Sequence, residues 1–370
     1  MTQHPPGGPP PGPPADAYPP HPAPGTGRPP VWAPPPPPPS QEWYAEQARQ
    51  QQLRKDHPHV EPQTYPLILR TRDYAWWKPL VGLLFGAMVF FMAQILLFVL
   101  IIIGAVVDGG STSLGDRIEQ AARLDTVTPW SMLYLNLGLA SLILVSWLVV
   151  RVVHGLPLRW LASVRPGIRW KFLFACTGVA VVALVISLIV GAFLPGDADG
   201  VSGTAAFPTG QLLATAVVIL LTTPLQAIGE EYGFRGYLMQ AFGSFSGSRV
   251  VAVVLSSGLF ALAHGTQNVP LFFDRFAFGL TAGILVILVG GLEAGIALHV
   301  LNNLLAFGFA IAFDQLDSTL TVSEASWWQL VLTVTQNGIF IGLVLLVARR
   351  MGLRTTTMPA PASSRSEQPV

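Results

Sequence analysis

The chain has 370 residues, of which 51% are hydrophobic and 11% are charged. Soluble domains carry about 25% charged residues, so this composition excludes an ordinary soluble enzyme. The formal net charge of +1, together with the lack of basic patches with interleaved aromatic residues, excludes a nucleic-acid partner. The single cysteine, Cys176, has no partner in the chain for a disulfide.

Proline dominates the start of the chain. Of the 33 prolines, 19 lie in residues 1–40, where too few apolar side chains occur to offset the entropy of ordering the backbone. The polar stretch that follows also lacks a hydrophobic face. We expect residues 1–75 to be a disordered, proline-rich cytoplasmic tail and residues 351–370 to be a disordered C-terminal tail. The start lacks signal-peptide features, so the first apolar segment should direct insertion.

Eight apolar segments follow, each near or above the roughly 18 residues that a bilayer crossing requires. The expected fold is all-α, a polytopic transmembrane helical bundle of about eight spans within residues 76–350. The spans are expected at 79–107, 131–153, 171–194, 210–229, 249–264, 271–290, 293–313 and 328–348.

The loops between these spans differ in charge. Lys and Arg flank the first span, fill the loop between the second and third, and follow the last, whereas 195–209 and 314–327 contain neither. By the positive-inside rule, both termini should be cytoplasmic. We therefore expect an integral multi-pass protein of the plasma membrane.

Ionisable residues within spans are concentrated in the motif-bearing core, residues 210–313. Each costs roughly 2.5–3.5 kcal/mol on insertion scales, so those that persist are functional candidates. The first group is Glu230-Glu231-Tyr-Gly-Phe-Arg235. On a helix, Glu231 and Arg235 are i,i+4 neighbours suited to an ion pair, while Glu230 points about 100° away. The competing interpretation is a solvated helix end.

Two further pairs stand at i,i+4 spacing. Phe260 shares a helix face with His264, and His299 shares one with Asn303. Each pair alone is more typical of structural packing, and Asn302, one residue off that face, is the weaker amide candidate. Polar side chains in hydrocarbon need polar partners, however, so we expect the pairs to converge.

The same half of the chain carries two weaker signals. Asp274 and Arg275 are adjacent and suit either a local ion pair or a substrate contact, of which we favour the pair. Gly279 and Gly283 predict close helix packing inside the bundle rather than a dimer seam.

One glutamate, two histidines and an asparagine suit peptide-bond hydrolysis by activated water. A carboxylate can take a proton from water, an imidazole can position that water, and an amide can donate to the developing oxyanion. The same Glu230, His264 and His299 could instead bind a divalent metal such as Zn, although no His-Glu-x-x-His sequence is present. The residues alone leave both alternatives open.

The motifs Glu-Glu-x-x-x-Arg, Phe-x-x-x-His and His-x-x-x-Asn resemble those of the CAAX protease and bacteriocin-processing family of intramembrane endopeptidases. The resemblance covers residues 210 to 310 and implies an all-helical membrane fold whose active-site cavity opens to the cytoplasm. It also implies a protein or peptide substrate, lipidated or not, in contact with membrane lipid. Family members cleave near the C-terminus of prenylated CAAX proteins or, in bacteria, act in peptide processing and bacteriocin self-immunity.

The resemblance also implies a role for each motif residue. Glu230 would activate water that His264 shares, and His299 with Asn303 would stabilise the oxyanion. Glu231 would pair with Arg235 to fix the helix.

Two functions of other classes compete with hydrolysis. Buried Glu, His and Arg also mark transporters and proton-coupled channels, although the paired broken helices of transporters are not evident here. A scaffold whose proline-rich arm recruits SH3-like partners would leave the Glu230 group dispensable.

The expected spans leave one difficulty. Glu230 and His299 should lie near the cytoplasmic ends of their spans, but His264 should lie roughly 22 Å from the start of its span by helix rise. Either residues 224–242 dip back into the membrane, or the span that bears His264 is strongly tilted.

Overall fold

The computed structural model describes residues 40–194 and 209–358. The chain divides into two units, residues 1–49 and 50–370. Of the first unit the structure describes residues 40–49, which include the start of helix α1 (Gln41–Asp56). Within the described residues every regular element is helical, which confirms the all-α fold.

Seven helices or continuous helical runs of the described residues are long and apolar enough to cross a membrane. The protein is therefore a multi-pass integral membrane protein. The runs are α2 with α3 (Trp77–Leu97 and Val99–Val107), α5 (Pro129–Val153), α7 (Trp170–Gly191), α8 through α9 (Gly210–Ser246), α11 (Val269–Val289), α12 (Glu293–Ala312) and α14 (Trp327–Arg350).

The expected eighth span does not meet the same criterion. The segment predicted at 249–264 forms α10 (Arg249–Leu262), whose 14 residues are fewer than the roughly 18 that a crossing requires. The predicted count of about eight is therefore one too high by length and composition. Shorter elements complete the described fold: η2 (Tyr65–Leu67), α4 (Leu114–Arg123), α6 (Arg159–Ala162) and α13 (Leu316–Leu320).

Side-chain caps define where several of these helices begin. Thr128, Thr209 and Asn268 each accept a hydrogen bond from the backbone N–H three residues on, at 3.2, 3.2 and 3.0 Å. Gly247 and Gly290 end α9 and α11 with positive φ angles of 73° and 72°, which glycine adopts readily. These local signals fix ends of α5 and α11 and of the run from α8 to α9, which carries the first motif.

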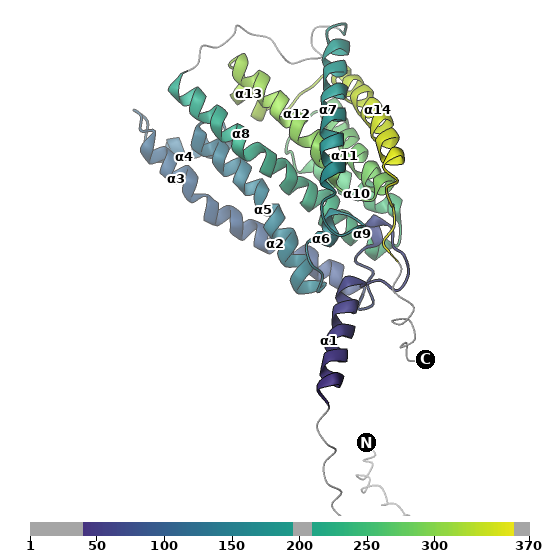
Figure 1. Ribbon diagram of the computed structural model, residues 1–370. Coiled ribbons are helices and arrows are strands. Elements are labelled where there is room, and N and C mark those ends of the chain that lie inside the picture. The colour runs from purple at the N-terminus through teal and green to yellow at the C-terminus, as the bar shows by residue number, and fades with distance from the viewer. Residues whose placement is uncertain (1–39, 195–208, 359–370) are drawn as a thin grey trace, which may run out of the picture. The chain divides into compact units, whose positions relative to one another are not determined.

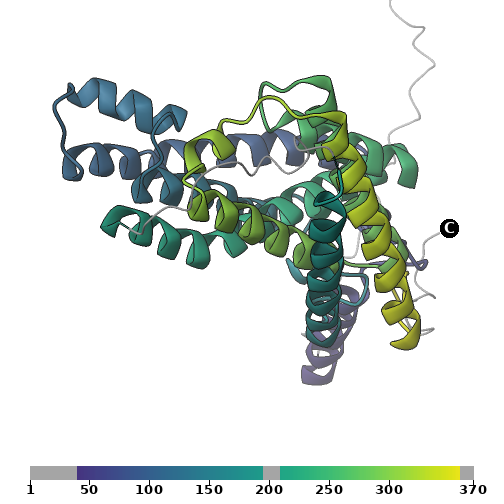
Figure 2. The same cartoon turned by 90° about the horizontal axis from the view of Figure 1, so that it is seen from above.

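Neighbouring helices are often distant in the sequence. In both views α7 (teal) lies beside α14 (yellow), while α3 and α4 lie at the opposite edge (Figures 1 and 2). The main packing partners follow the order α2, α5, α8, α12, α7, α14, α11 and α10. The motif-bearing helices α8, α10 and α12 are thus held on several sides by the other spans.

Glycines allow the closest helix contacts. A Cβ at Gly229 would clash with the Leu139 carbonyl oxygen on α5, so α8 can approach α5 only with glycine here. Gly279 and Gly283 of α11 face Ser257 and Val253 of α10, where an added Cβ would meet side-chain atoms at 3.0 Å. The predicted internal packing of the two α11 glycines is confirmed.

The segments that flank the spans are also ordered. Tyr65, Ile68 and Leu69 are buried, and the Tyr65 hydroxyl donates a hydrogen bond to the Leu161 carbonyl. The prediction of a disordered tail is therefore wrong for residues 40–75, because a short apolar run there packs into the helical core. For residues 1–39 it lies outside the described part of the chain.

The two flanks meet each other. Thr64 and Thr356 form an antiparallel bridge, and the Thr357 N–H donates to the Gln63 carbonyl at 2.9 Å. The C-terminal tail predicted at 351–370 is therefore ordered through residue 358, and the rest lies outside the described residues. The segments before the first span and after the last lie at the same end of the bundle.

Candidate active site

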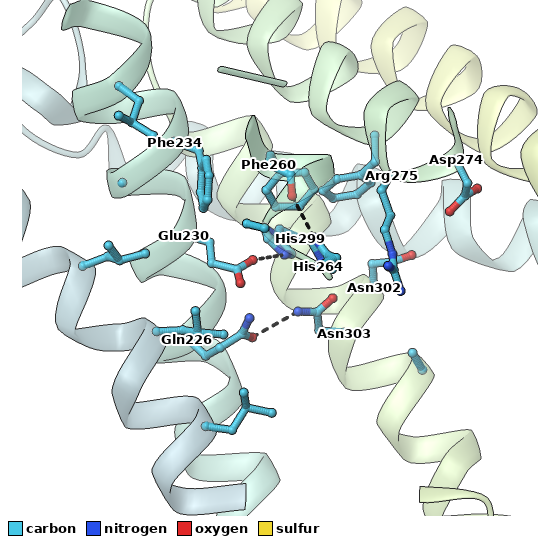
Figure 3. A pocket seen from close by; sticks show the side chains of 18 of the residues that line it. Gln226, Glu230, Phe234, Phe260, His264, Asp274, Arg275, His299, Asn302 and Asn303 are labelled. Carbon is cyan, nitrogen blue, oxygen red and sulfur yellow. Dashed lines mark hydrogen bonds and ion pairs between the residues drawn. The ribbon is translucent and has the colours of Figure 1, made fainter. Parts of the chain in front are cut away.

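The three motifs converge on one cavity of about 800 Å³. Glu230 from α8, His264 from the turn after α10, and His299 and Asn303 from α12 all line it (Figure 3). Glu231 does not line the cavity, and its side chain is fully buried behind the wall. The expected divergence of the two adjacent glutamates is thus present in the structure.

A local change of helix type separates these glutamates. Residues Glu231–Leu238 form a π-helical segment, η3, which continues α8 directly into α9 (Met239–Ser246). Such segments are rare and occur frequently at functional sites. The sequence analysis expected an α-helix here and did not predict η3.

Glu231 and Arg235 form the predicted ion pair. Arg235 Nη1 donates to Glu231 Oε1 at 3.0 Å, and both side chains are 0% exposed. The Arg235 guanidinium also lies 4.0 Å from the centroid of the Phe260 ring, within the range of a cation–π contact. Because both charges are removed from water, neither can lose its partner without leaving a buried charge.

His299 lies between the two glutamates. Its Nδ1 is 2.9 Å from Glu231 Oε1, and its Nε2 is 3.2 Å from Glu230 Oε2. A carboxylate accepts hydrogen bonds, so Nδ1 carries a proton toward Glu231. The approach of Nε2 to Glu230 is attractive only if a second proton lies between them. The imidazole therefore links the buried ion pair to the glutamate in the cavity.

His264 is fixed by its own helix. Its Nδ1 lies 2.8 Å from the Phe260 carbonyl oxygen, and because that oxygen only accepts, Nδ1 carries the proton. In the neutral ring, Nε2 is then a hydrogen-bond acceptor. The His264 and Phe260 rings meet edge to face with centroids 4.8 Å apart.

The length of the α8–α9 run explains how His264 reaches the site. Glu230 was predicted to lie near the end of its span. That prediction is wrong, because the helical run continues to Ser246. The stretch from Glu230 to Ser246 and the returning stretch from Arg249 to His264 are nearly equal in length, so the two side chains come to a similar depth. Of the two alternatives left open by the sequence, the segment at 224–242 that dips back is not found, because these residues continue the helix.

Asn303 has a partner that the sequence analysis did not single out. Its Nδ2 donates to Gln226 Oε1 at 3.1 Å, which occupies one of its two N–H groups. Gln226 lies one helical turn before Glu230, so i,i+4 spacing from the motif would have identified it. Phe278 of α11 was also missed, and its ring packs on His299 with centroids 5.1 Å apart.

Comparison with known proteins agrees with this geometry. Residues 212–305 match the family profile described as type II CAAX prenyl endopeptidase Rce1-like. These residues form an Rce1-like domain. The match confirms the family resemblance, and it contains all three motifs, from Glu230 to Asn303.

The wider chain has one more informative relative. The uncharacterized protein YyaK of Bacillus subtilis (strain 168) is 25% identical over 211 residues, which cover 54% of this chain and 69% of that protein. No solved structure matches the chain. The match over residues 212–305 is therefore the finding that bears on function.

The arrangement of acidic and imidazole side chains decides whether a metal ion could be held. Among the described residues, no three His, Cys, Asp or Glu side chains are arranged to hold a metal ion. Glu230 and His299 approach each other closely, but the second nitrogen of His299 faces Glu231. The predicted set of Glu230, His264 and His299 therefore does not fit a three-ligand Zn site in this geometry.

The cavity extends beyond residues 212–305 and reaches the end of the bundle opposite the paired flanks. Leu124, Thr319 and Leu320 line it there, where Val127 also bonds Asp317 of α13. Toward the cation-rich end, Leu83 and Tyr237 line the cavity, and the Tyr237 hydroxyl donates to the carbonyl of Pro79 near the start of α2. The resemblance predicts that the cavity opens to the cytoplasm, and the charge bias predicts that the cation-rich end lies there. The side on which each terminus lies stays a prediction.

Proposed function

We propose that this protein is an intramembrane endopeptidase that hydrolyses peptide bonds with a water molecule activated by Glu230. The observation that carries the proposal is the convergence of Glu230, His264 and Asn303, from three helical elements, on one cavity. The Rce1-like domain supports the class of reaction, because the family is one of CAAX-type intramembrane proteases. The same match favours hydrolysis over transport.

In the proposed reaction, Glu230 accepts a proton from water as the water oxygen attacks the scissile carbonyl carbon. His264 Nε2 accepts a hydrogen bond from the same water and orients it. The N–H of Asn303 that Gln226 does not occupy donates to the oxyanion. When the C–N bond breaks, Glu230 returns its proton to the leaving amine, which gives one new carboxyl end and one new amino end.

Glu231, Arg235 and His299 have a positioning role in this proposal. With the second proton on His299, Glu230 is ionised and is held 3.2 Å from Nε2 in a charge-assisted contact. Both His299 nitrogens are then engaged, so we assign oxyanion stabilisation to Asn303 rather than to His299 with Asn303. The ion pair of Glu231 and Arg235 holds the imidazole from behind.

The cavity walls suggest the kind of substrate. Apolar residues from α2, α5, η3 and α11 line much of the cavity, whereas α14 contributes mainly polar residues, Gln329, Thr333 and Gln336. An extended peptide with apolar side chains or a lipid group can therefore be accommodated. We therefore propose CAAX-type processing near a substrate C-terminus, with bacterial peptide processing as the second possibility within the family. The proposed location is the plasma membrane, with both termini in the cytoplasm.

The test is a cleavage assay on the full chain in neutral lipid discs, with a library of quenched fluorogenic peptides. Glu230→Gln should lower kcat by about 10²- to 10⁴-fold, because it removes the general base but keeps the shape of the side chain. Glu324→Gln, the same change in an exposed loop, is the control and should leave kcat unchanged. Cleavage by Glu230→Gln at the wild-type rate would overturn the proposal.

A chelator titration in the same assay tests direct activation by Glu230. We expect cleavage to continue unchanged, because the residues do not form a three-ligand set. Activity that is lost with chelator and restored by added Zn would assign water activation to a metal instead.

A further inference from the structure

Arg275 is a charged residue within a membrane-spanning helix that the proposed reaction does not use. It lies on α11 and lines the same cavity as Glu230 and His264. A cation in such a span is costly and marks a functional site by default. The question is what neutralises its charge.

Arg235 and Arg169, two buried or nearly buried arginines of the described bundle, have carboxylate partners. Arg235 Nη1 lies 3.0 Å from Glu231, and Arg169 Nη2 lies 2.6 Å from Glu293. Arg275 Nη1 instead donates to a neutral acceptor, Gln267 Oε1, at 3.0 Å. No ion pair within 4.0 Å joins Arg275 to a carboxylate anywhere in residues 40–194 or 209–358.

The adjacent acid, Asp274, attracts this charge but does not contact it. Asp274 and Arg275 do not form the local ion pair that the sequence favoured: the Asp274 carboxylate interacts with Thr333, and its Oδ1 is buried without a hydrogen-bond partner in the described structure. The Asp274 carboxylate lies apart from the guanidinium in Figure 3. The alternative prediction, a substrate contact, therefore becomes the better interpretation.

Gln267 fixes the guanidinium with respect to the catalytic residues. Its Nε2 donates to the Ala261 carbonyl of α10 at 2.7 Å, while its Oε1 accepts from Arg275. Arg275 is thereby tied to the end of the helix that precedes His264. Figure 3 shows Glu230 and Arg275 on opposite sides of His264. Glu230 and Arg275 thus line different parts of the cavity, and Asp274 lines it beside Arg275.

We propose that Arg275 binds the C-terminal carboxylate of the peptide that is cleaved at Glu230. This inference rests on the proposed function and names a residue that determines its specificity. A guanidinium binds a carboxylate through two parallel N–H donors, and one polar side of Arg275 is held by Gln267 while the group faces the cavity. The separation between Glu230 and Arg275 then sets the distance of the cleaved bond from the free C-terminus.

The experiment compares two forms of a peptide that the wild-type protein cleaves, one with a free C-terminal carboxylate and one with a C-terminal amide. In phosphatidylcholine discs, the wild type should cleave the acid with a kcat/KM about 10- to 100-fold higher than the amide. Arg275→Gln should remove this preference mainly through KM on the acid. Its kcat/KM on the amide should match the wild type, which shows that the catalytic groups remain intact.

Three results would overturn the assignment. Equal cleavage of both peptides by the wild type would exclude carboxylate recognition. Equal loss on both peptides in Arg275→Gln would indicate a structural role. A dependence on Arg275 that appears only in discs with phosphatidylglycerol would assign the guanidinium to an anionic lipid headgroup.

A binding measurement separates this inference from the proposed function. On the Glu230→Gln background, the Kd of the acid peptide should be about 10-fold or more below that of the amide, and Arg275→Gln should equalise the two. If the acid is preferred but the wild type cleaves nothing, the carboxylate site stands and the proposed endopeptidase fails. If cleavage occurs but the two Kd values are equal, the endopeptidase stands and the role of Arg275 fails.

Discussion

Glu230 and Glu231 are consecutive in the chain, yet their side chains face different surroundings. Glu231 has a 0% exposed side chain paired with Arg235 and His299, and it is absent from the lining of the cavity. Glu230 lines a cavity of about 800 Å³ beside His264 and Asn303. The closed side, formed by Glu231 and Arg235, holds the geometry, and the open side presents the reacting groups.

The comparison shows that a single helical run can carry residues that stabilise the fold on one side and residues that take part in the proposed reaction on the other. Two residues in sequence turn about 100° apart on a helix, so one can enter the protein interior while the other enters a cavity. His299 connects the sides, because its two nitrogens contact one glutamate each. Changes on the closed side should therefore lower both stability and activity, whereas changes on the open side should lower activity alone.

The largest effect is expected from breaking the ion pair on the closed side. Arg235→Met removes the cation that pairs with the buried Glu231 carboxylate and leaves it only His299 as a partner, which should lower the free energy of unfolding by about 3–5 kcal/mol and abolish cleavage. Thermal unfolding of the purified protein in detergent measures the first effect, and peptide cleavage measures the second. Glu230→Gln is the matched open-side control, for which we expect lost cleavage at an unchanged unfolding temperature.

A second variant tests whether the Glu231 charge, without Arg235 beside it, causes the loss of stability. Glu231→Gln combined with Arg235→Met removes both charges, so much of the lost stability should return while cleavage remains absent. If Arg235→Met unfolds at the wild-type temperature, the closed side does not hold the structure.

The next largest effect is expected at the oxyanion donor on the open side. Asn303→Ala should lower kcat by about 10²- to 10³-fold without changing the unfolding temperature, because it removes one donor to the transition state. Gln226→Ala is the matched control, because it removes the partner of Asn303 in the free protein and leaves the amide in place. Equal losses of kcat in the two variants would show that Asn303 acts only through its bond to Gln226.

Much of this arrangement could be predicted from the sequence. The apolar segments predicted the helical bundle, and i,i+4 spacing predicted the contact of Glu231 with Arg235 because both follow from local periodicity. The end of the span at residue 229 was wrong for a physical reason. Three charged residues in close succession look like a solvated helix end, although here Arg235 and the distant His299 are the partners of the two carboxylates inside a run that continues to Ser246.

Other features depend on contacts between distant parts of the chain. The apolar run that contains Tyr65 is short and polar at its flanks, and its burial requires α6, whose Leu161 it contacts. The π-helical segment η3 likewise has no marker in the spacing of apolar residues. The sequence left open whether Arg275 forms an ion pair with Asp274, because adjacency in the chain does not determine where either side chain points.

The smallest of these effects is expected from one methyl group on the closed side. In Gly295→Ala on α12, the added Cβ would lie 2.7 Å from Glu231 Oε2, so the ion pair must shift. Overpacking of this kind should lower the free energy of unfolding by about 1–3 kcal/mol and slow cleavage. Thermal unfolding and the peptide assay give both readouts.

Gly308→Ala provides the control on the same helix. A Cβ at Gly308 would meet no atom within 4 Å, so this variant should keep full activity and gain up to about 1 kcal/mol from the better helix propensity of alanine. The two variants differ only in which side of α12 receives the methyl group. If Gly295→Ala behaves like Gly308→Ala, the closed side tolerates movement of Glu231, and the precise seating of His299 cannot depend on it.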